Sequence, residues 1–136
     1  MAPKALTSML AKLRPRGPAA GEAGESMACE YLRGLGYQIV ARNFRCRSGE
    51  VDIVARDGEA TVFVEVKERS SDSHGEGHEA VTFRKRRRVI RAAQLFAASR
   101  GLFDARLRFD VISIDRRSAG KPQLRHDRGA FDVDGG

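Results

Sequence analysis

Apolar residues recur along this chain with the period of an α-helix in two segments. The first predicted helix covers 21–36, where a glycine near the end can stop it. The second covers 82–99, because Thr82 is a good N-cap residue and Gly101 follows its end. The stripe of the first helix consists of Ala28, Tyr31, Leu32 and Leu35, and that of the second of Val89, Ile90, Ala93, Phe96 and Ala97.

Four further segments are rich in β-branched and other strand-forming residues, namely 37–44, 50–56, 61–67 and 106–114. Asp57-Gly58 separates two of them and is a strong hairpin signal. The strand at 61–67, the second helix and the strand at 106–114, which is apolar on both faces, form a crossover unit, so these two strands should pair in parallel. A short segment at 123–126 can add an edge strand. The sequence therefore predicts an α/β fold with an α-β-β-β-α-β core, a mixed sheet flanked by helices.

The length of 136 residues suits one domain with a single modest core. We expect a flexible basic N-terminal arm over 1–20, one domain over 21–131 and a disordered tail over 132–136. The polar, glycine-containing segment 70–79 is expected to form a mobile loop that can close over a ligand. No apolar run approaches the roughly 18 residues that a membrane span needs, and the N-terminus lacks the apolar segment of a secretory signal.

Cys29 and Cys46 are the only cysteines, and they lack the paired CxxC spacing of a zinc site. A site that added His74 and His78 is conceivable, but its ligands would come from a helix, a strand end and a loop. Two distant thiols fit a reducing compartment better than a disulfide scaffold, so we expect a cytoplasmic protein.

The net charge of +7 favours a polyanionic partner, because neutralising phosphates releases counterions. Basic residues crowd the start of the second predicted helix, on the side opposite its apolar stripe. A solvated basic face with no ligand is the alternative. The expected nucleic-acid-binding residues are Arg84, Lys85, Arg87, Arg88 and Arg91, and the track can extend to Arg42, Arg45 and Arg47.

Acidic residues alternate with aliphatic ones on the two hairpin strands. In GEVDIVA, Asp52 lies on the face opposite Val51, Ile53 and Ala55; in TVFVEVK, Glu65 and Lys67 share a face. If the hairpin pairs around Asp57-Gly58, the charged rows fall on the same side, with the aliphatic rows turned inward. A cross-strand ion pair on a solvated sheet face is the plain alternative.

Two carboxylates beside a lysine suit phosphodiester hydrolysis. Mg²⁺ takes oxygen ligands and needs only one or two protein carboxylates, which Asp52 and Glu65 can supply. The metal polarises the phosphoryl oxygen and activates a bound water, and Lys67 can orient that water or offset negative charge. Glu25 lies beside the apolar stripe of the first helix and is a candidate fourth site residue, although a helix-start carboxylate favoured by the dipole is an equally good interpretation.

The segments GEVDIVARDG and VFVEVKER resemble the restriction-endonuclease-like superfamily, whose site is written PD-(D/E)xK. More narrowly, roughly 21–131 resembles the YraN-like family of uncharacterised bacterial proteins, considered related to archaeal Holliday junction resolvases. The resemblance also includes GEAGESMACEYLRGLGY, VTFRKRRR and RFDVISID. It implies the same core and assigns Asp52, Glu65 and Lys67 to the metal-binding and catalytic positions, with Glu25 as the helical acid. Val51 replaces the proline of the superfamily motif.

Three functions are compatible with these features. The first is an endonuclease that uses Mg²⁺ or Mn²⁺ to cut branched or flapped DNA, in which cutting both strands would require a homodimer. The second is a non-catalytic nucleic-acid-binding module of a DNA-processing assembly. The third is an adaptor whose basic face meets an acidic protein. We rank them in this order because D…ExK is not required by a purely structural hairpin.

Overall fold

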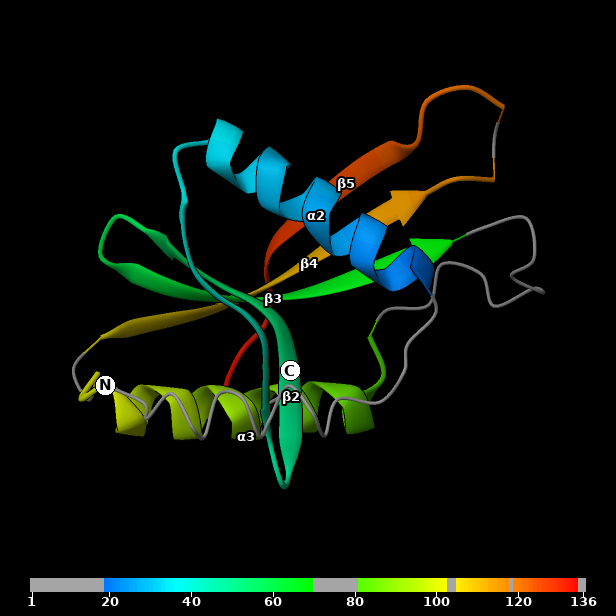
Figure 1. Cartoon of the computed structure of the whole chain (residues 1–136). Helices are drawn as coiled ribbons and strands as arrows, with labels where there is room; N and C mark the ends of the chain where they lie inside the picture. Colours follow the sequence, from blue (N-terminus) through cyan, green and yellow to red (C-terminus); the bar gives the residue numbers. More distant parts are fainter. Residues whose placement is uncertain (1–18, 70–80, 103–104, 118, 135–136) are drawn as a thin grey trace.

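The computed structural model describes residues 19–69, 81–102, 105–117 and 119–134 (Figure 1). The expected N-terminal arm (apart from its last two residues) and the loop at 70–79, with His74 and His78, lie outside the described residues. Along the chain the elements are α2 (Ala19–Gly34), β1 (Gln38–Cys46), β2 (Gly49–Asp57), β3 (Ala60–Arg69), α3 (Phe83–Ser99), β4 (Arg106–Asp115) and β5 (Gln123–Phe131). The predicted order α-β-β-β-α-β is confirmed, and the edge strand β5 is longer than expected.

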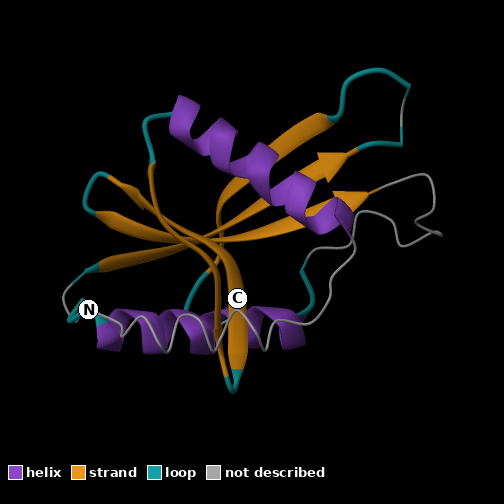
Figure 2. Cartoon of the chain, in the orientation of Figure 1, coloured by secondary structure: helices purple, strands orange, loops and turns teal. Residues whose placement is uncertain are grey.

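The strands form one mixed sheet in the order β1-β2-β3-β4-β5. Neighbouring strands are antiparallel except β3 and β4, which pair in parallel as the crossover through α3 predicts. Asp57 pairs with Ala60, so the hairpin turn consists of Gly58 and Glu59, and Gly58 has a φ of +61°. Helix α2 lies over one face of the sheet and α3 under the other (Figures 1 and 2).

Each helix covers its own apolar core. The α3 core contains Val51, Phe63, Phe109 and Phe131 together with Val89, Ile90, Ala93 and Phe96 of the predicted stripe. Ala97, the last residue of that stripe, is also buried. The α2 core contains Ala28, Leu32, Ile53, Ala55, Val62 and Val64. Because both faces are covered, the central strands are apolar on both sides. Leu35 was predicted in the α2 stripe, but it is 44% exposed because α2 ends at Gly34 and the chain turns away through Gly36, whose φ is +91°.

The aliphatic row of β2 was expected on one face, and this expectation is wrong. Val51 packs into the α3 core, whereas Ile53 and Ala55 pack into the α2 core. The β2–β3 ladder ends at the pair Ile53–Val64, so the first residues of β2 are free of β3 and turn toward α3. Across from Asp52 on the register of β1, Asn43 has a φ of 53°, a left-handed conformation that asparagine tolerates best among non-glycine residues.

Gly49 fixes how close this end of β2 comes to α3. A Cβ atom at this position would lie 1.9 Å from the backbone oxygen of Arg88, far inside van der Waals contact. The tip of the β1–β2 hairpin therefore packs directly on the α3 backbone, which only glycine permits. This contact holds Glu50 and Asp52 beside the first turns of α3.

Strand β4 was expected to be apolar on both faces, but its α2 side contains a buried polar network. Asp110 is fully buried and accepts hydrogen bonds from the guanidinium of Arg108 and the amide of Gly129. His126 Nε2 lies 2.7 Å from the same carboxylate, and His126 Nδ1 lies 3.1 Å from the hydroxyl of Tyr31 on α2. Burial alone would raise the pKa of Asp110, but these hydrogen bonds outweigh burial and lower the pKa. The network ties β5 to β4 and α2.

Among the described residues, no helix is long and apolar enough to cross a membrane. The two cysteines are free thiols on opposite faces of the sheet: Cys29 is buried in the α2 core, and Cys46 packs against the α3 core. They do not approach each other, as a shared zinc site would require.

Candidate functional site

Asp52 and Glu65 meet where the β2–β3 ladder ends. Continuing the register of the pair Ile53–Val64 places Asp52 directly opposite Glu65. Asp52 Oδ2 accepts a hydrogen bond of 2.8 Å from the amide of Val66, so the carboxylate takes the place of a backbone partner on β3. The two carboxyl groups also share a hydrogen bond. The predicted convergence of these two acids is therefore present in the structure.

The pair lies in a poorly hydrated environment. Glu65 is only 2% exposed, and its side chain is on the α3 side of the sheet. Burial, followed by the charge of Asp52, raises the pKa of Glu65 to about 8. Burial also raises the pKa of Asp52, although the Val66 amide and the nearby Lys85 ammonium oppose the shift. Glu65 therefore does not lie on a solvated sheet face, whereas Asp52 is partly exposed.

Lys85 supplies the positive charge at this pair. Its Nζ lies 2.7 Å from Oε1 of Glu65. Burial alone would lower the pKa of Lys85, but the charges of Glu65 and Asp52 raise it. The sequence placed Lys85 with the nucleic-acid-binding arginines. A signal for its position was available, because Lys85 precedes Val89 by four residues and so lies in line with the buried stripe of α3, although its side chain is 51% exposed.

Lys67 was the expected lysine of the site. It lies two residues beyond Glu65 on the same face of β3, as predicted. There it lines a hollow of about 640 Å³ over β3, β4 and β5, together with other basic side chains. The basic residues of this hollow are Lys67, Arg69, Arg86, Arg125 and Arg128, and its acids are Asp115 and Asp127.

Glu25 is buried on α2, as expected for an acid beside the apolar stripe. Among the described residues, however, no three His, Cys, Asp or Glu side chains are arranged to hold a metal ion together. Glu25 therefore does not complete a three-carboxylate cluster with Asp52 and Glu65. Two carboxylates are enough for a hard divalent cation that keeps water and phosphate as its other ligands, so the Asp52–Glu65 pair fits Mg²⁺ or Mn²⁺.

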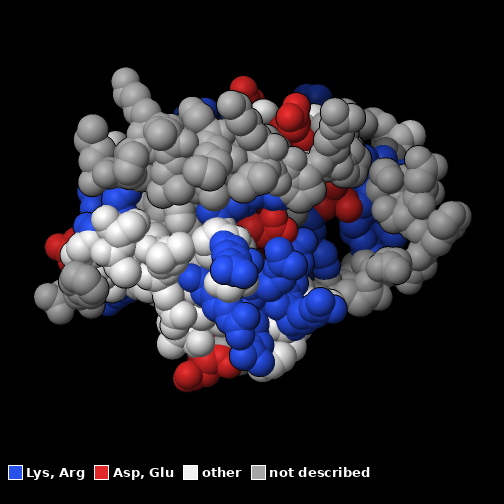
Figure 3. Space-filling model, turned by 60° about the horizontal axis from the view of Figure 1, so that its bottom comes forward, with Lys and Arg blue, Asp and Glu red and all other residues white. Residues whose placement is uncertain are grey.

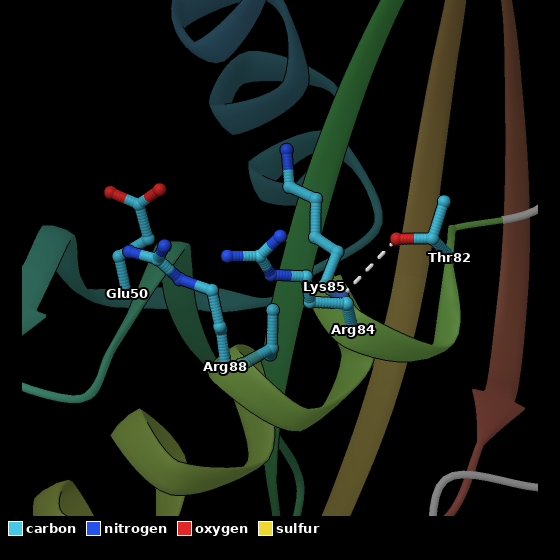
Figure 4. Close-up of a pocket in the computed structure, with 6 residues that line it drawn as sticks. Glu50, Thr82, Arg84, Lys85 and Arg88 are labelled. Carbon is cyan, nitrogen blue, oxygen red and sulfur yellow. Dashed lines mark hydrogen bonds between the residues drawn. The ribbon is translucent and has the colours of Figure 1, made fainter.

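A hollow of about 260 Å³ opens at the first turns of α3, lined by Glu50, Thr82, Arg84, Lys85, Arg88 and Val89. Figure 4 shows Lys85 and Arg88 extending from α3 on the side where Glu50 lies. Thr82 begins the helix as predicted, and its hydroxyl accepts a hydrogen bond from the Lys85 amide. The cap thus fixes the turn that carries Lys85.

The exposed side of α3 is strongly basic. Figure 3 shows lysine and arginine side chains gathered in one patch on this face of the molecule. Arg84, Arg87, Arg88 and Arg91 are all exposed, as their position opposite the buried stripe predicted. They line a hollow of about 420 Å³ with Arg47, Ser48 and Phe83, so the β1–β2 turn contributes the fifth arginine. We call these residues the arginine cradle. Of the other expected basic residues, Arg45 pairs with Glu50 and Arg42 donates to Ser26.

The sequence matches the model of the uncharacterised protein family UPF0102 over residues 24–114. A UPF0102 protein of Geotalea uraniireducens is 47% identical over 83% of this chain and 89% of its own length. One from Geobacter metallireducens is 50% identical over 83% of this chain and 92% of its own length. One from Symbiobacterium thermophilum is 46% identical over 82% of this chain and 94% of its own length. The YraN-like resemblance is thus confirmed at the level of the family, and the chain belongs to UPF0102.

Proposed function

We propose that this protein is a metal-dependent endonuclease that hydrolyses phosphodiester bonds in branched, flapped or otherwise structured DNA. The observation that carries the proposal is the adjacent pair of half-buried Asp52 and fully buried Glu65 beside the arginine cradle. Placing two acids side by side, one of them buried, is unfavourable. Lys85 compensates one of the two charges, and a bound divalent cation would compensate both. The resemblance of D…ExK to restriction-endonuclease-like nucleases supports the same chemistry.

Each residue of the site has a role in this proposal. Asp52 and Glu65 would hold Mg²⁺ or Mn²⁺, and the Val66 amide keeps the Asp52 carboxylate in a fixed direction. The ion, when bound, supplies a polarised phosphoryl oxygen and a water of lowered pKa. Lys85 neutralises Glu65 in the metal-free site and can turn its ammonium to a phosphate oxygen, while Lys67 offers a second cation from β3. Glu25 acts at longer range, through water.

The arginine cradle supplies the contacts to the DNA backbone. Its charges lie on one helix face next to Lys85, so a bound strand would carry a phosphate toward the carboxylate pair. Phosphate contacts carry no sequence information, and we therefore propose recognition of DNA structure rather than of bases. One domain holds one such site and cuts one strand, so cutting both strands requires a homodimer. The proposed place of action is the cytoplasm.

The test is cleavage of a panel of labelled forks, flaps, four-way junctions and plain duplexes with Mg²⁺ or Mn²⁺. D52N and E65Q should lose cleavage while retaining the thermal unfolding of a folded protein. E30Q is the matched control, because Glu30 is an exposed acid on α2. If D52N and E65Q cut as well as the wild type, the proposed site is wrong.

A non-catalytic nucleic-acid-binding module is the second candidate, and one observation favours it. The Lys85–Glu65 ion pair gives the buried acid a cationic partner, so the charge of Glu65 is compensated without a metal. This function predicts salt-sensitive DNA binding that is equal in wild type, D52N and E65Q, with no cleavage of any substrate. Arg87→Ala and Arg91→Ala should weaken that binding, because both remove phosphate contacts from the cradle.

A further inference from the structure

Phe83 is an aromatic side chain that the fold leaves in solvent. It is the first residue of α3 and is 60% exposed, more than any other large apolar side chain among the described residues. Its ring forms part of the arginine cradle, and the guanidinium of Arg87 lies 6.0 Å from the ring centroid. An exposed aromatic residue in a patch of arginines suggests a binding surface.

The start of α3 does not need this ring. The apolar contact that commonly fixes the entry of a helix comes from the residue before the N-cap. Here that residue is Val81, which is buried in the α3 core. Phe83 instead lies above Arg87, four residues on, on the basic side of the helix. Phe83 therefore contributes little to the core, and its position is set by the surface it shares with the arginines.

The chemistry of the cradle fits a nucleic-acid strand with an unpaired base. Arginines contact phosphates, and a flat apolar ring beside them can stack on the face of a base. In an intact duplex each base is already covered by its neighbours, so the ring can stack only on a base at a fork, flap, gap or strand end. A purely protein partner would leave the five arginines of the cradle to be matched by acidic side chains.

The path from the cradle to the carboxylate pair is short. Phe83 and Lys85 are separated by about 200° around α3, and the exposed arginines lie between them on the helix surface. A strand that follows this face travels slightly more than half of the helix circumference, roughly 17–20 Å. This distance corresponds to about five or six nucleotides at the stacked spacing of 3.4 Å.

We propose that Phe83 is a base-stacking platform that selects DNA with an unpaired base within about six nucleotides of the phosphate held at Asp52 and Glu65. This inference rests on the proposed function and names its substrate class: a junction between duplex and single strand. The geometry that carries it is the exposed ring, the five arginines around it and Lys85 at the far side of the same helix turn.

The test measures the preference for a fork over a duplex. Dissociation constants of both labelled DNAs are measured by fluorescence anisotropy in EDTA for wild type, F83A, F83W and L95A. Leu95 is the matched control, since it is 50% exposed on α3 but lies outside the cradle. F83A should lower the fork-to-duplex preference about tenfold, which corresponds to the loss of one stacked base. F83W and L95A should keep it, and all four proteins should unfold at similar temperatures.

A second readout reports stacking directly. 2-Aminopurine at the unpaired position should be quenched by the wild type and F83W but not by F83A. An unchanged preference together with unchanged quenching in F83A overturns the stacking platform. If F83A has no effect while the wild type still cuts DNA through Asp52 and Glu65, the inference alone fails. If the wild type binds neither DNA, the proposed function fails with it.

Discussion

The ammonium of Lys85 lies 2.7 Å from the carboxylate of Glu65, so an ion pair joins the first turn of α3 to the middle of β3. Lys85 and Glu65 are twenty positions apart in the sequence, and Lys85 is held in place by the Thr82 cap while Glu65 is held by the sheet. This contact brings a cation to the position where a bound metal would also compensate the charge. If Asp52 and Glu65 hold a divalent ion as proposed, Lys85 and that ion compete for the same carboxylate.

This competition predicts that removing the Lys85 side chain raises the affinity for the metal ion and lowers the rate of DNA cleavage. At pH 9, above the pKa of about 8 of Glu65, K85A should bind Mg²⁺ or Mn²⁺ several-fold more tightly than the wild type in calorimetric titration, because no ammonium has to leave Glu65. The same variant should cut DNA more slowly, since the cation near the phosphate is gone. R84A removes a neighbouring exposed cation that does not contact Glu65, and it should leave metal affinity near that of the wild type. Weaker metal binding in K85A would mean that Lys85 supports the ion.

The pKa of Glu65 predicts how stability changes with pH. Because the folded-state pKa is raised to about 8 from 4.5, the folded protein keeps a proton that the unfolded chain has lost between these values. The free energy of unfolding should therefore fall as pH rises through this range. E65Q removes the titration, so its free energy of unfolding should rise relative to that of the wild type from pH 5 to pH 9. Thermal unfolding in EDTA measures this difference, with E30Q as the control. A difference that is constant with pH contradicts the raised pKa of Glu65.

The same pKa predicts the pH dependence of metal binding. A metal ion must displace the proton that Glu65 holds below about pH 8. A ligand that binds only the folded state raises its melting temperature. The rise caused by about 10 mM Mg²⁺ should be larger at pH 9 than at pH 6. D52N and E65Q should show no rise at either pH. An equal rise in these variants would place the metal elsewhere.

The close packing of Gly49 on α3 predicts that adding a side chain at this position destabilises the protein. G49A places a methyl group against the Arg88 backbone, so the hairpin tip must leave α3 or the helix must shift. We expect a loss of about 2–4 kcal/mol of unfolding free energy, typical of overpacking against rigid backbone. G21A is the matched control, because nothing lies within 4 Å of a Cβ built there, and it should be neutral or slightly stabilising. Chemical denaturation of both variants gives the comparison, and equal stabilities would show that the tip can relax.

Asn43 offers a conformational test of the same region. Its φ of 53° favours glycine and disfavours a β-branched side chain. N43G should match or exceed the stability of the wild type, whereas N43V should lose about 1–2 kcal/mol. Because Asn43 lies across from Asp52, N43V should also weaken Mg²⁺ binding, measured by the same titration. Comparable stability of the two variants would mean that the backbone at this position can return to an extended conformation.

Local patterns determined most of the fold and half of the site. Three features depend only on neighbours within a few residues, so the sequence predicted them: the apolar stripe of α3, its Thr82 cap and the hairpin turn after Asp57. The same applies to Asp52 and Glu65. Once the hairpin register is known, alternation along two antiparallel strands places both acids on one side.

Only the tertiary structure decided what surrounds these acids. The Lys85 contact, the burial of Glu65 and the approach of Gly49 to Arg88 depend on which helix covers which face of the sheet. Val51 changes cores because β2 leaves β3 at Asp52, a bend that strict alternation does not contain. These features arise from contacts between segments far apart in sequence, where packing and desolvation outweigh local preference. Periodicity therefore identified the acids, and packing gave them their cation and their raised pKa.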